Sequence, residues 1–230
     1  MEISVIGSSF DADWTVTTET PGRPARTVGP ATLPYDAMMF ETRDPDCAAA
    51  HNTGYFPGGV YRYSKRFTAP QEWRDCVVEC EFEGVYHRSH VLLNGVEVGG
   101  CPSGYTEFRV PLTGLRFGET NTIEVIVDNS QQPNSRWYTG SGIYRPVHVL
   151  VGPAVHIAPG YPQVTTRTVA TGTATLDIRT DVVNAGDTDR DVWLAITVDD
   201  PSGQPVQQAR RTVQVATGAR LPVTQTVEIP

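Results

Sequence analysis

Short stretches in which apolar and polar residues alternate recur along most of this chain, separated by turn residues. Residues 60–67, 105–112 and 121–129 follow this pattern, which is typical of a half-buried β-strand. Residues 90–100 add a hairpin pattern with Asn94-Gly95 at its tip, the dipeptide that favours a tight two-residue turn. Because the chain also has 21 glycines, 18 prolines and no long helical periodicity, we predict an all-β protein.

The composition changes near Pro153, which divides the chain into two predicted domains. Residues 1–153 combine a proline-broken, irregular lead over residues 1–58 with strands that indicate a jelly-roll sandwich. Residues 154–230 are poor in aromatic side chains and predict an immunoglobulin-like β-sandwich. They offer only about five strand patterns, whereas such a sandwich usually has about seven strands. We therefore expect the second domain to be small and incomplete.

The charge of the chain argues against two classes of partner. Its net charge is −8 and its pI is about 5.1, so there is no basic stripe to neutralise the phosphates of a nucleic acid or an anionic membrane. No apolar run approaches the roughly 20 residues that a membrane helix needs. The N-terminal residues also lack the basic and apolar regions of a secretory signal. We expect neither nucleic acid nor membrane as a partner.

The cysteines match no metal-binding or redox spacing. They are Cys47, Cys76, Cys80 and Cys101. Free thiols in a cytoplasmic protein are the favoured interpretation, with a disulfide or a metal site as the alternative. His87 and His90 are three residues apart, which places them on opposite sides of a strand, so they predict no metal site. Phosphate-binding loops, serine nucleophile elbows and zinc motifs are absent from the sequence.

The connection DNSQQPNSRWYTGSGIYRPV, from Asp128 to Val147, concentrates polar and aromatic side chains between two apolar strands. A sugar presents hydroxyl groups and apolar C–H faces, so its site needs carboxylate, amide and guanidinium groups near aromatic rings. This composition fits that need. In the structural interpretation, which stays open, Asp128 caps a turn, Arg136 forms a salt bridge and Trp137 braces a domain boundary.

Longer motifs follow one another in order between residues 30 and 152. They are LPYDAM (33–38), YFPGGVYRYSKRF (55–67), VECEFEGVYHRSHVLLNGVEVG (78–99), GYTEFRVPLTG (104–114) and NTIEVIVDNSQQPNSRWYTGSGIYRPVHV (121–149). This series resembles the N-terminal part of glycoside hydrolase family 2, most of all its bacterial β-galactosidase branch. LPYDAM departs from the family's Leu-Pro-His-Asp-Trp element, because Tyr35 replaces the histidine and Met38 lies near the tryptophan position.

The resemblance implies a jelly-roll sugar-binding domain, then an immunoglobulin-like sandwich, then a TIM barrel that carries two catalytic glutamates. A retaining glycosidase needs two carboxyl groups about 5–5.5 Å apart, and a barrel takes at least about 200 residues. Residues 154–230 cannot hold such a barrel. We therefore expect this chain to be the non-catalytic N-terminal part of a retaining β-glycosidase, inactive alone, with its own barrel domain as partner.

The same resemblance implies that Asp128, Asn129, Arg136 and Trp137 bind substrate. Asp128 would accept hydrogen bonds from sugar hydroxyls, with Asn129 beside it, and in some family members it also contacts a cation. Arg136 would reach the sugar ring or orient a barrel carboxylate, and Trp137 would form the wall of the subsite. The ligand would be a terminal β-linked sugar, with galactose favoured and glucuronate or mannose left open. We expect no other cofactor.

Two other functions stay open at this stage. The chain is alternatively a free-standing carbohydrate-binding module, or a purely structural module for contacts between domains or subunits. An unfinished second sandwich favours the glycosidase, because a free module would complete its sheets. Open sheet edges also invite pairing with another chain, so we expect a homo-oligomer.

Overall fold

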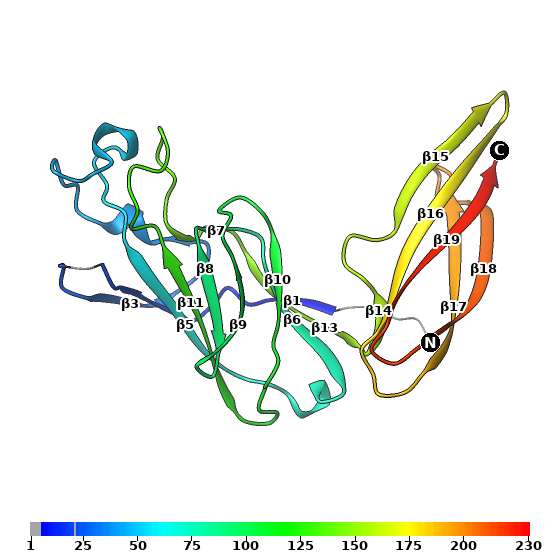
Figure 1. Ribbon diagram of the computed structural model, residues 1–230, viewed down its shortest axis with the longest axis horizontal. Coiled ribbons are helices and arrows are strands. Elements are labelled where there is room, and N and C mark those ends of the chain that lie inside the picture. The colour runs from blue at the N-terminus through cyan, green and yellow to red at the C-terminus, as the bar shows by residue number, and fades with distance from the viewer. Residues whose placement is uncertain (1–5, 21) are drawn as a thin grey trace. The chain divides into compact units, whose positions relative to one another are not determined.

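The computed structural model describes residues 6–20 and 22–230. Strands make up 55% and helices 5% of the described residues, so the prediction of an all-β protein is confirmed. The chain divides into two compact units, Ile6–Val151 and Gly152–Pro230 (Figure 1), and each has its own apolar core. The first unit is a jelly-roll sandwich and the second an immunoglobulin-like sandwich.

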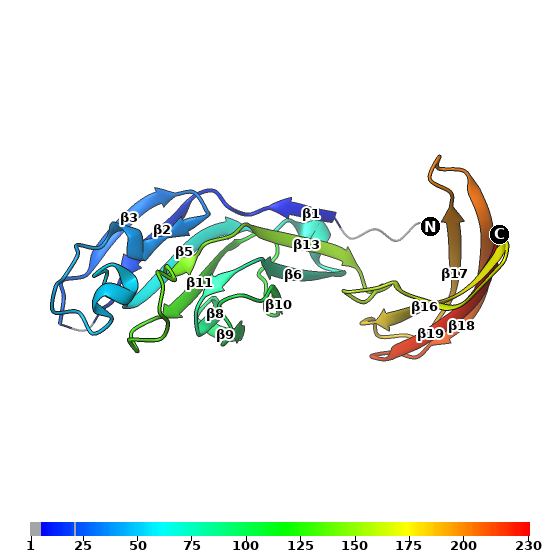
Figure 2. The same ribbon diagram turned by 90° about the horizontal axis from the view of Figure 1, so that it is seen from above.

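The first unit contains two main antiparallel sheets (Figures 1 and 2). The larger sheet has the strand order β3 (Arg26–Ala31), β2 (Trp14–Thr18), β5 (Val60–Thr68), β11 (Thr120–Asp128), β8 (Ser89–Leu93) and β9 (Val96–Cys101). The smaller sheet has the order β1 (Ile6–Ser9), β13 (Val147–Pro153), β6 (Cys76–Phe82) and β10 (Phe108–Pro111).

Shorter elements complete this unit. A small sheet has the order β4 (Tyr35–Asp36), β12 (Gly142–Ile143) and β7 (Val85–Tyr86). The described helical turns are of the 3-10 type: η1 (Ala37–Phe40), η2 (Ala50–Thr53) and η3 (Gln71–Trp73). The small sheet matters for function because β12 lies within the connection that the sequence analysis singled out.

The core of the first unit lies between its two main sheets. Alternate residues of β11, namely Ile123, Val125 and Val127, are fully buried, and Tyr61 and Tyr63 of β5 are buried in the same core. The facing sheet contributes Val78, Cys80, Phe82, Val110, Val147 and Val149. This is the period-two burial that the alternating stretches predicted. Burial of each such side chain contributes about 1.5–3 kcal/mol.

The predicted hairpin over residues 90–100 is confirmed. β8 and β9 pair in antiparallel register, and Asn94 and Gly95 between them have φ values of 51° and 83°. Positive φ at both central residues is the requirement of the tight turn that suits a twisted hairpin. The Asn94 side chain also accepts a hydrogen bond from the Thr122 N–H at 3.0 Å, which ties the turn to β11.

The prediction of an irregular lead over residues 1–58 is wrong in part. β2 pairs with β5, and Trp14 of β2 is fully buried, with its indole N–H donating to the Phe10 carbonyl at 2.8 Å. β3 contains Pro30 but lies at the edge of the sheet. An edge strand tolerates proline because one side of its backbone needs no partner. The prolines therefore did not exclude strands there.

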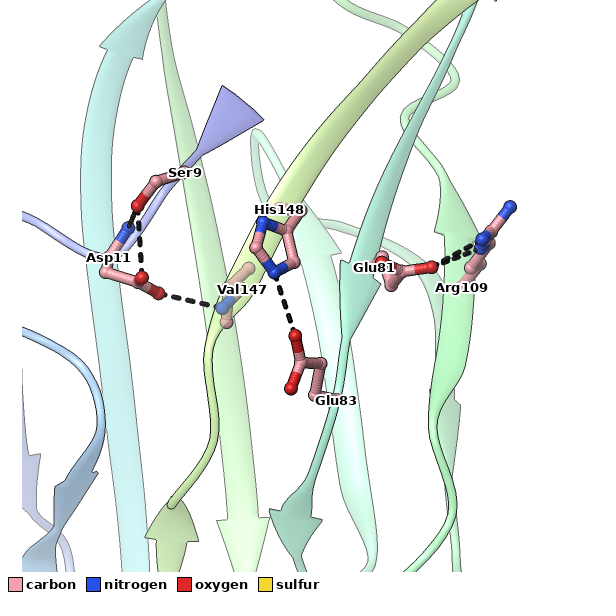
Figure 3. Close-up of polar contacts among 7 residues, drawn as sticks. All are labelled: Ser9, Asp11, Glu81, Glu83, Arg109, Val147 and His148. Carbon is pink, nitrogen blue, oxygen red and sulfur yellow. Dashed lines mark hydrogen bonds and ion pairs between the residues drawn. The ribbon is translucent and has the colours of Figure 1, made fainter. Parts of the chain in front are cut away.

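Asp11 joins the N-terminal strand to β13 (Figure 3). Its carboxylate accepts hydrogen bonds from the Ser9 hydroxyl at 3.0 Å and from the Val147 N–H at 2.7 Å. The Phe10 N–H donates to the Val147 carbonyl at 2.8 Å. Both polar backbone groups of Val147, the last residue of the connection, are thus paired.

One ion pair and one histidine–carboxylate contact lie on the outer face of the smaller sheet (Figure 3). His148 of β13 lies 2.9 Å from Glu83, which follows β6, and Arg109 of β10 donates to Glu81 of β6 at 2.6 Å. These pairs are partly exposed, and such pairs contribute at most about 1 kcal/mol each. Strand pairing and burial, and not these contacts, stabilise the sheet.

The second unit has six strands, one more than the sequence indicated. One sheet joins β16 (Thr173–Asn184) to β14 (Val155–Ile157), β15 (Gln163–Ala170) and β19 (Arg220–Ile229). The other is a hairpin of β17 (Arg190–Asp199) and β18 (Pro205–Val215). The buried core cluster of the second unit is small and consists of Val182, Val215 and Val223. Across residues 6–20 and 22–230, no helix is long and apolar enough to span a membrane.

We predict that Asp11→Ala lowers the free energy of unfolding of the first unit by about 1–3 kcal/mol. The substitution leaves the N–H of the fully buried Val147 without its acceptor. Urea denaturation measures the change, with Asp75→Ala, an exposed aspartate of the same unit, as the matched control. We expect that control to stay within about 0.5 kcal/mol of the parent. Equal losses in the two variants would contradict the role of Asp11.

Candidate functional site

The candidate site begins where β11 ends. The register of β11 places Asp128 opposite Val60 of β5 and Val127 opposite Ser89 of β8. The end of the central strand therefore lies beside the start of both neighbouring strands. Residues 86–88, which precede β8, are brought against the connection by this register alone.

Asp128 caps the first turn of the connection, as the structural interpretation expected. Its Oδ1 atom accepts hydrogen bonds from the N–H of Ser130 at 2.9 Å and from the hydroxyl of Ser130 at 2.6 Å. Partial burial raises the pKa of the Asp128 carboxyl, but the Ser130 hydrogen bonds and the nearby Arg88 charge outweigh it and hold this pKa below its usual value. Asp128 is therefore ionised near neutral pH. Its Oδ2 atom has no hydrogen bond within the described chain, so one oxygen stays available to a ligand.

Asn129 is the centre of a buried hydrogen-bond network. Its side chain is 0% exposed. Nδ2 donates to the Gly140 carbonyl at 3.1 Å and to the Ser141 hydroxyl, while Oδ1 accepts from Gln132 at 2.9 Å and from the Asn134 amide. This environment argues against the predicted sugar contact of Asn129, because every polar atom of its side chain is already used. We assign it the role of holding both arms of the connection together.

Arg136 and Trp137 lie on the exposed part of the connection. Within residues 6–20 and 22–230, Arg136 forms neither an ion pair nor a side-chain hydrogen bond, so the alternative of a salt bridge finds no support there. Trp137 is 60% exposed, and its indole N–H donates to the hydroxyl of Tyr105 at 3.3 Å. Both predicted side chains are free to meet a ligand.

An aromatic cluster of Tyr86, His87, Tyr105 and Trp137 extends from this contact. Tyr105 is 61% exposed and meets Tyr86 edge to face at 5.4 Å, and the ring of His87 lies 4.6 Å from that of Tyr86. Gly104 leaves room for the Tyr86 ring, which an added Cβ there would strike. The cluster offers the exposed rings of Tyr105 and Trp137 to the apolar face of a sugar. The buried ring of Tyr86 and the half-buried ring of His87 pack behind them.

Asp36 anchors the far end of the connection. It accepts hydrogen bonds from the Tyr138 hydroxyl at 2.7 Å, from the Ser141 N–H at 2.8 Å and from the Met38 N–H at 3.0 Å. Burial, and then the hydrogen bond to Asp36, raise the pKa of Tyr138 above its usual value, so Tyr138 stays a donor. Gly142 has a φ of 123°, and a Cβ there would overlap the Tyr63 hydroxyl. Only glycine fits at this position.

Arg88 and His87 also belong to the site, although the sequence pattern did not indicate Arg88 and suggested His87 only as a metal ligand. Arg88 donates to the side chain of Gln131 at 2.6 Å and to the Asp128 carbonyl at 3.3 Å, and its Nη2 atom is buried without a partner in the described structure. Partial burial and then the Arg88 charge lower the pKa of His87 below its usual value. The signal that could have indicated both residues is the antiparallel pairing of β8 with β11, which places the residues before β8 beside the end of β11.

The cation that the resemblance associates with Asp128 finds few ligands in this chain. No group of three or more His, Cys, Asp or Glu side chains that could hold a metal ion occurs among the described residues. One carboxylate oxygen of Asp128 is already committed to Ser130. Among the described residues, Asp128 therefore belongs to no group of three or more such side chains.

Three known proteins resemble this chain over most of its length, although no protein-family model matches it. It is 33% identical over 229 residues to the beta-galactosidase BoGH2A of Bacteroides ovatus. The aligned region covers 96% of this chain and 27% of that protein. It is 28% identical over 192 residues to a beta-glucuronidase of Formosa agariphila, across 74% of this chain and 20% of that protein. A solved glycosyl hydrolase family 2 member from Bacteroides cellulosilyticus superposes with a TM-score of 0.81 and 25% identity, over 97% of this chain and 30% of that one. This chain therefore spans no more than 27% of the length of the two curated relatives.

We predict that His87 titrates below the ordinary histidine pKa of about 6.5. Since the folded state then binds fewer protons than the unfolded state, the stability that His87 contributes is complete above about pH 6.5 and declines as the pH falls. An NMR titration of the imidazole signals measures the pKa. Arg88→Gln should raise it, because a nearby positive charge is removed. Arg66→Gln, at an exposed position of β5, is the matched control. A His87 pKa at or above 6.5 would contradict the prediction.

Proposed function

Because the chain belongs to glycoside hydrolase family 2, we propose that it forms the non-catalytic N-terminal part of a retaining β-glycosidase of the β-galactosidase type. Retention requires an acid/base carboxyl and a nucleophilic carboxylate about 5–5.5 Å apart. In this proposal a TIM-barrel partner domain supplies both groups. The short span of the match within the curated relatives supports such an arrangement.

The role of this chain is to complete the subsite for the terminal, non-reducing sugar. The observation that carries the proposal is the pair of exposed rings, Trp137 and Tyr105, linked by a hydrogen bond at the end of the central strand. They would stack on the C–H face of the sugar. The free Oδ2 of Asp128 would accept a hydroxyl hydrogen bond, and the Arg136 guanidinium would donate one. Polar groups directed at particular hydroxyls discriminate between sugars.

Galactose is the sugar that we propose for this subsite. The ionised Asp128 carboxylate accepts hydrogen bonds from the hydroxyl groups of a neutral sugar. The Bacteroides ovatus relative is named a beta-galactosidase, which favours the same choice, although the Formosa agariphila relative is named a beta-glucuronidase. A neutral sugar with several hydroxyl groups therefore fits this end of the connection best.

We also propose a cytoplasmic location. The four cysteines are free thiols in the structure, and structural thiols of this kind persist in reducing compartments.

We predict that the isolated chain self-associates. Within the described second unit β17 pairs only with β18, and an unpaired strand edge offers hydrogen-bonding groups to another chain. Sedimentation at rising concentration should therefore show a dimer or larger species. A chain that stays monomeric at high concentration would contradict this expectation.

We predict that the isolated chain binds methyl β-galactoside but does not hydrolyse it. In an NMR titration the Trp137 indole signal should shift saturably, and Trp137→Ala should abolish the shifts of the surrounding amides. Trp193→Ala is the matched control, because Trp193 is 51% exposed on the second unit and should leave binding unchanged. An aryl β-galactoside should show no hydrolysis above background. No shift on a folded spectrum, or saturable hydrolysis, would contradict the proposal.

A further inference from the structure

A cavity of about 430 Å³ opens between two segments of the first unit. One wall comes from Thr18, Arg23, Pro24 and Arg26, and the other from residues 40–45, which begin at the end of η1. None of the residues of the aromatic cluster lines it. Its volume lies within the range of about 300–1,000 Å³ that is usual for small-molecule sites.

The two carboxylates of this cavity share one arginine, which offsets one of their two negative charges. Arg23 lies 3.0 Å from Asp44 and 3.8 Å from Glu41. Glu41 also accepts a hydrogen bond from the Thr18 hydroxyl at 3.3 Å, and Asp44 accepts one from the Asp46 N–H at 2.9 Å. One arginine therefore serves both acidic side chains.

Two further arginines of the cavity, Arg26 and Arg43, form no ion pair among the described residues. Arg26 donates to the Phe40 carbonyl at 3.0 Å, which fixes its side chain but does not neutralise it. The Arg43 guanidinium lies over the ring of Phe56, 5.0 Å from its centroid. Neither has a carboxylate partner among the residues that the structure describes. Three arginines and two carboxylates line the cavity, so its lining has a net charge of +1 on a chain whose net charge is −8.

The cavity also has an apolar surface that suits a sugar ring. Phe40 is 46% exposed and stacks on Tyr35 with ring centroids 4.9 Å apart. Pro24 and Pro45 line the same cavity. A guanidinium presents a planar fork of donors that matches a carboxylate or sulfate group, and an adjacent aromatic ring packs against C–H groups. This chemistry selects a ring that carries an oxyanion.

The cavity borders the connection described above. Phe56 contacts Arg43 on one side and meets the ring of Tyr138, a residue of the connection, edge to face at 5.6 Å on the other. A ligand in the cavity and a sugar at the aromatic cluster would therefore lie on the same part of the first unit.

We propose that this cavity is a second carbohydrate subsite, which binds a sugar unit that carries a carboxylate or sulfate group through Arg26 and Arg43. The recognition of the oxyanion follows from the two arginines, whereas the carbohydrate part rests on the proposed function. The two subsites then differ in charge. A neutral sugar binds at the connection, and an acidic sugar binds in the cavity.

An NMR titration of the whole chain tests this proposal. The probes are methyl β-glucuronide for the carboxylate, galactose 6-sulfate for the sulfate, methyl β-galactoside as the neutral sugar, and sodium sulfate as the bare anion. We expect saturable shifts of the amides of residues 23–26 and 40–45 with at least one acidic sugar, at lower concentration than with either the neutral sugar or sodium sulfate. Whichever acidic sugar binds more tightly identifies the oxyanion.

The double variant Arg26→Gln/Arg43→Gln should weaken this binding at least about tenfold, since two charge-assisted hydrogen bonds are lost. Arg66→Gln, which removes an exposed charge of β5, should leave it unchanged. Equal weakening in the control, or equal binding of methyl β-galactoside at the cavity, would overturn the proposal. Sodium sulfate binding as tightly as both acidic sugars would overturn its carbohydrate part. If methyl β-galactoside did not bind near Trp137 while an acidic sugar still bound in the cavity, the proposed function would be contradicted and the cavity proposal would not.

Discussion

The register between β5 and β11 is the constraint on which the first unit depends. Val125 lies opposite Tyr63 and Val127 opposite Tyr61, and all four side chains are buried in the core between the sheets. A shift by one residue would turn this apolar set toward solvent, so burial itself enforces the register. The same register determines that the central strand ends at Asp128, beside the first residues of both neighbouring strands.

The connection that follows is held at its ends and free in its middle. Asn129 ties its two arms together from inside, and Asp36 accepts hydrogen bonds from Tyr138 and from the backbone beyond it. A buried amide is costly unless all of its hydrogen bonds are made, and here they are. The cost of burying the Asn129 amide and the hydrogen bonds that offset it both lie at the ends of the connection. Arg136 and Trp137, in its middle, stay exposed between these two anchored ends.

Charge is distributed unevenly over this acidic chain, and the distribution gives each proposed subsite its own preference. Asp128 keeps a low pKa and presents one free carboxylate oxygen at the connection. Arg26 and Arg43 present guanidinium groups that form no described ion pair at the neighbouring cavity. In the two proposals, the connection takes a neutral sugar and the cavity takes an acidic one. Together they would orient an oligosaccharide with mixed charge, because only one direction of binding satisfies both.

The sequence by itself determined the strand pattern, the tight turn at Asn94-Gly95 and the order of motifs that indicates the family, since each depends on residues close together in the chain. It indicated Trp137 and Asn129 alike as candidate sugar-binding residues, but not that Trp137 is exposed and Asn129 buried, because burial depends on partners as far as about ninety residues away in the chain. Only the tertiary structure decided that Arg88 lies beside Asp128 and that Asp11 binds the end of the connection. These contacts arise from which strands pair, and strand pairing is set by the packing of the whole core.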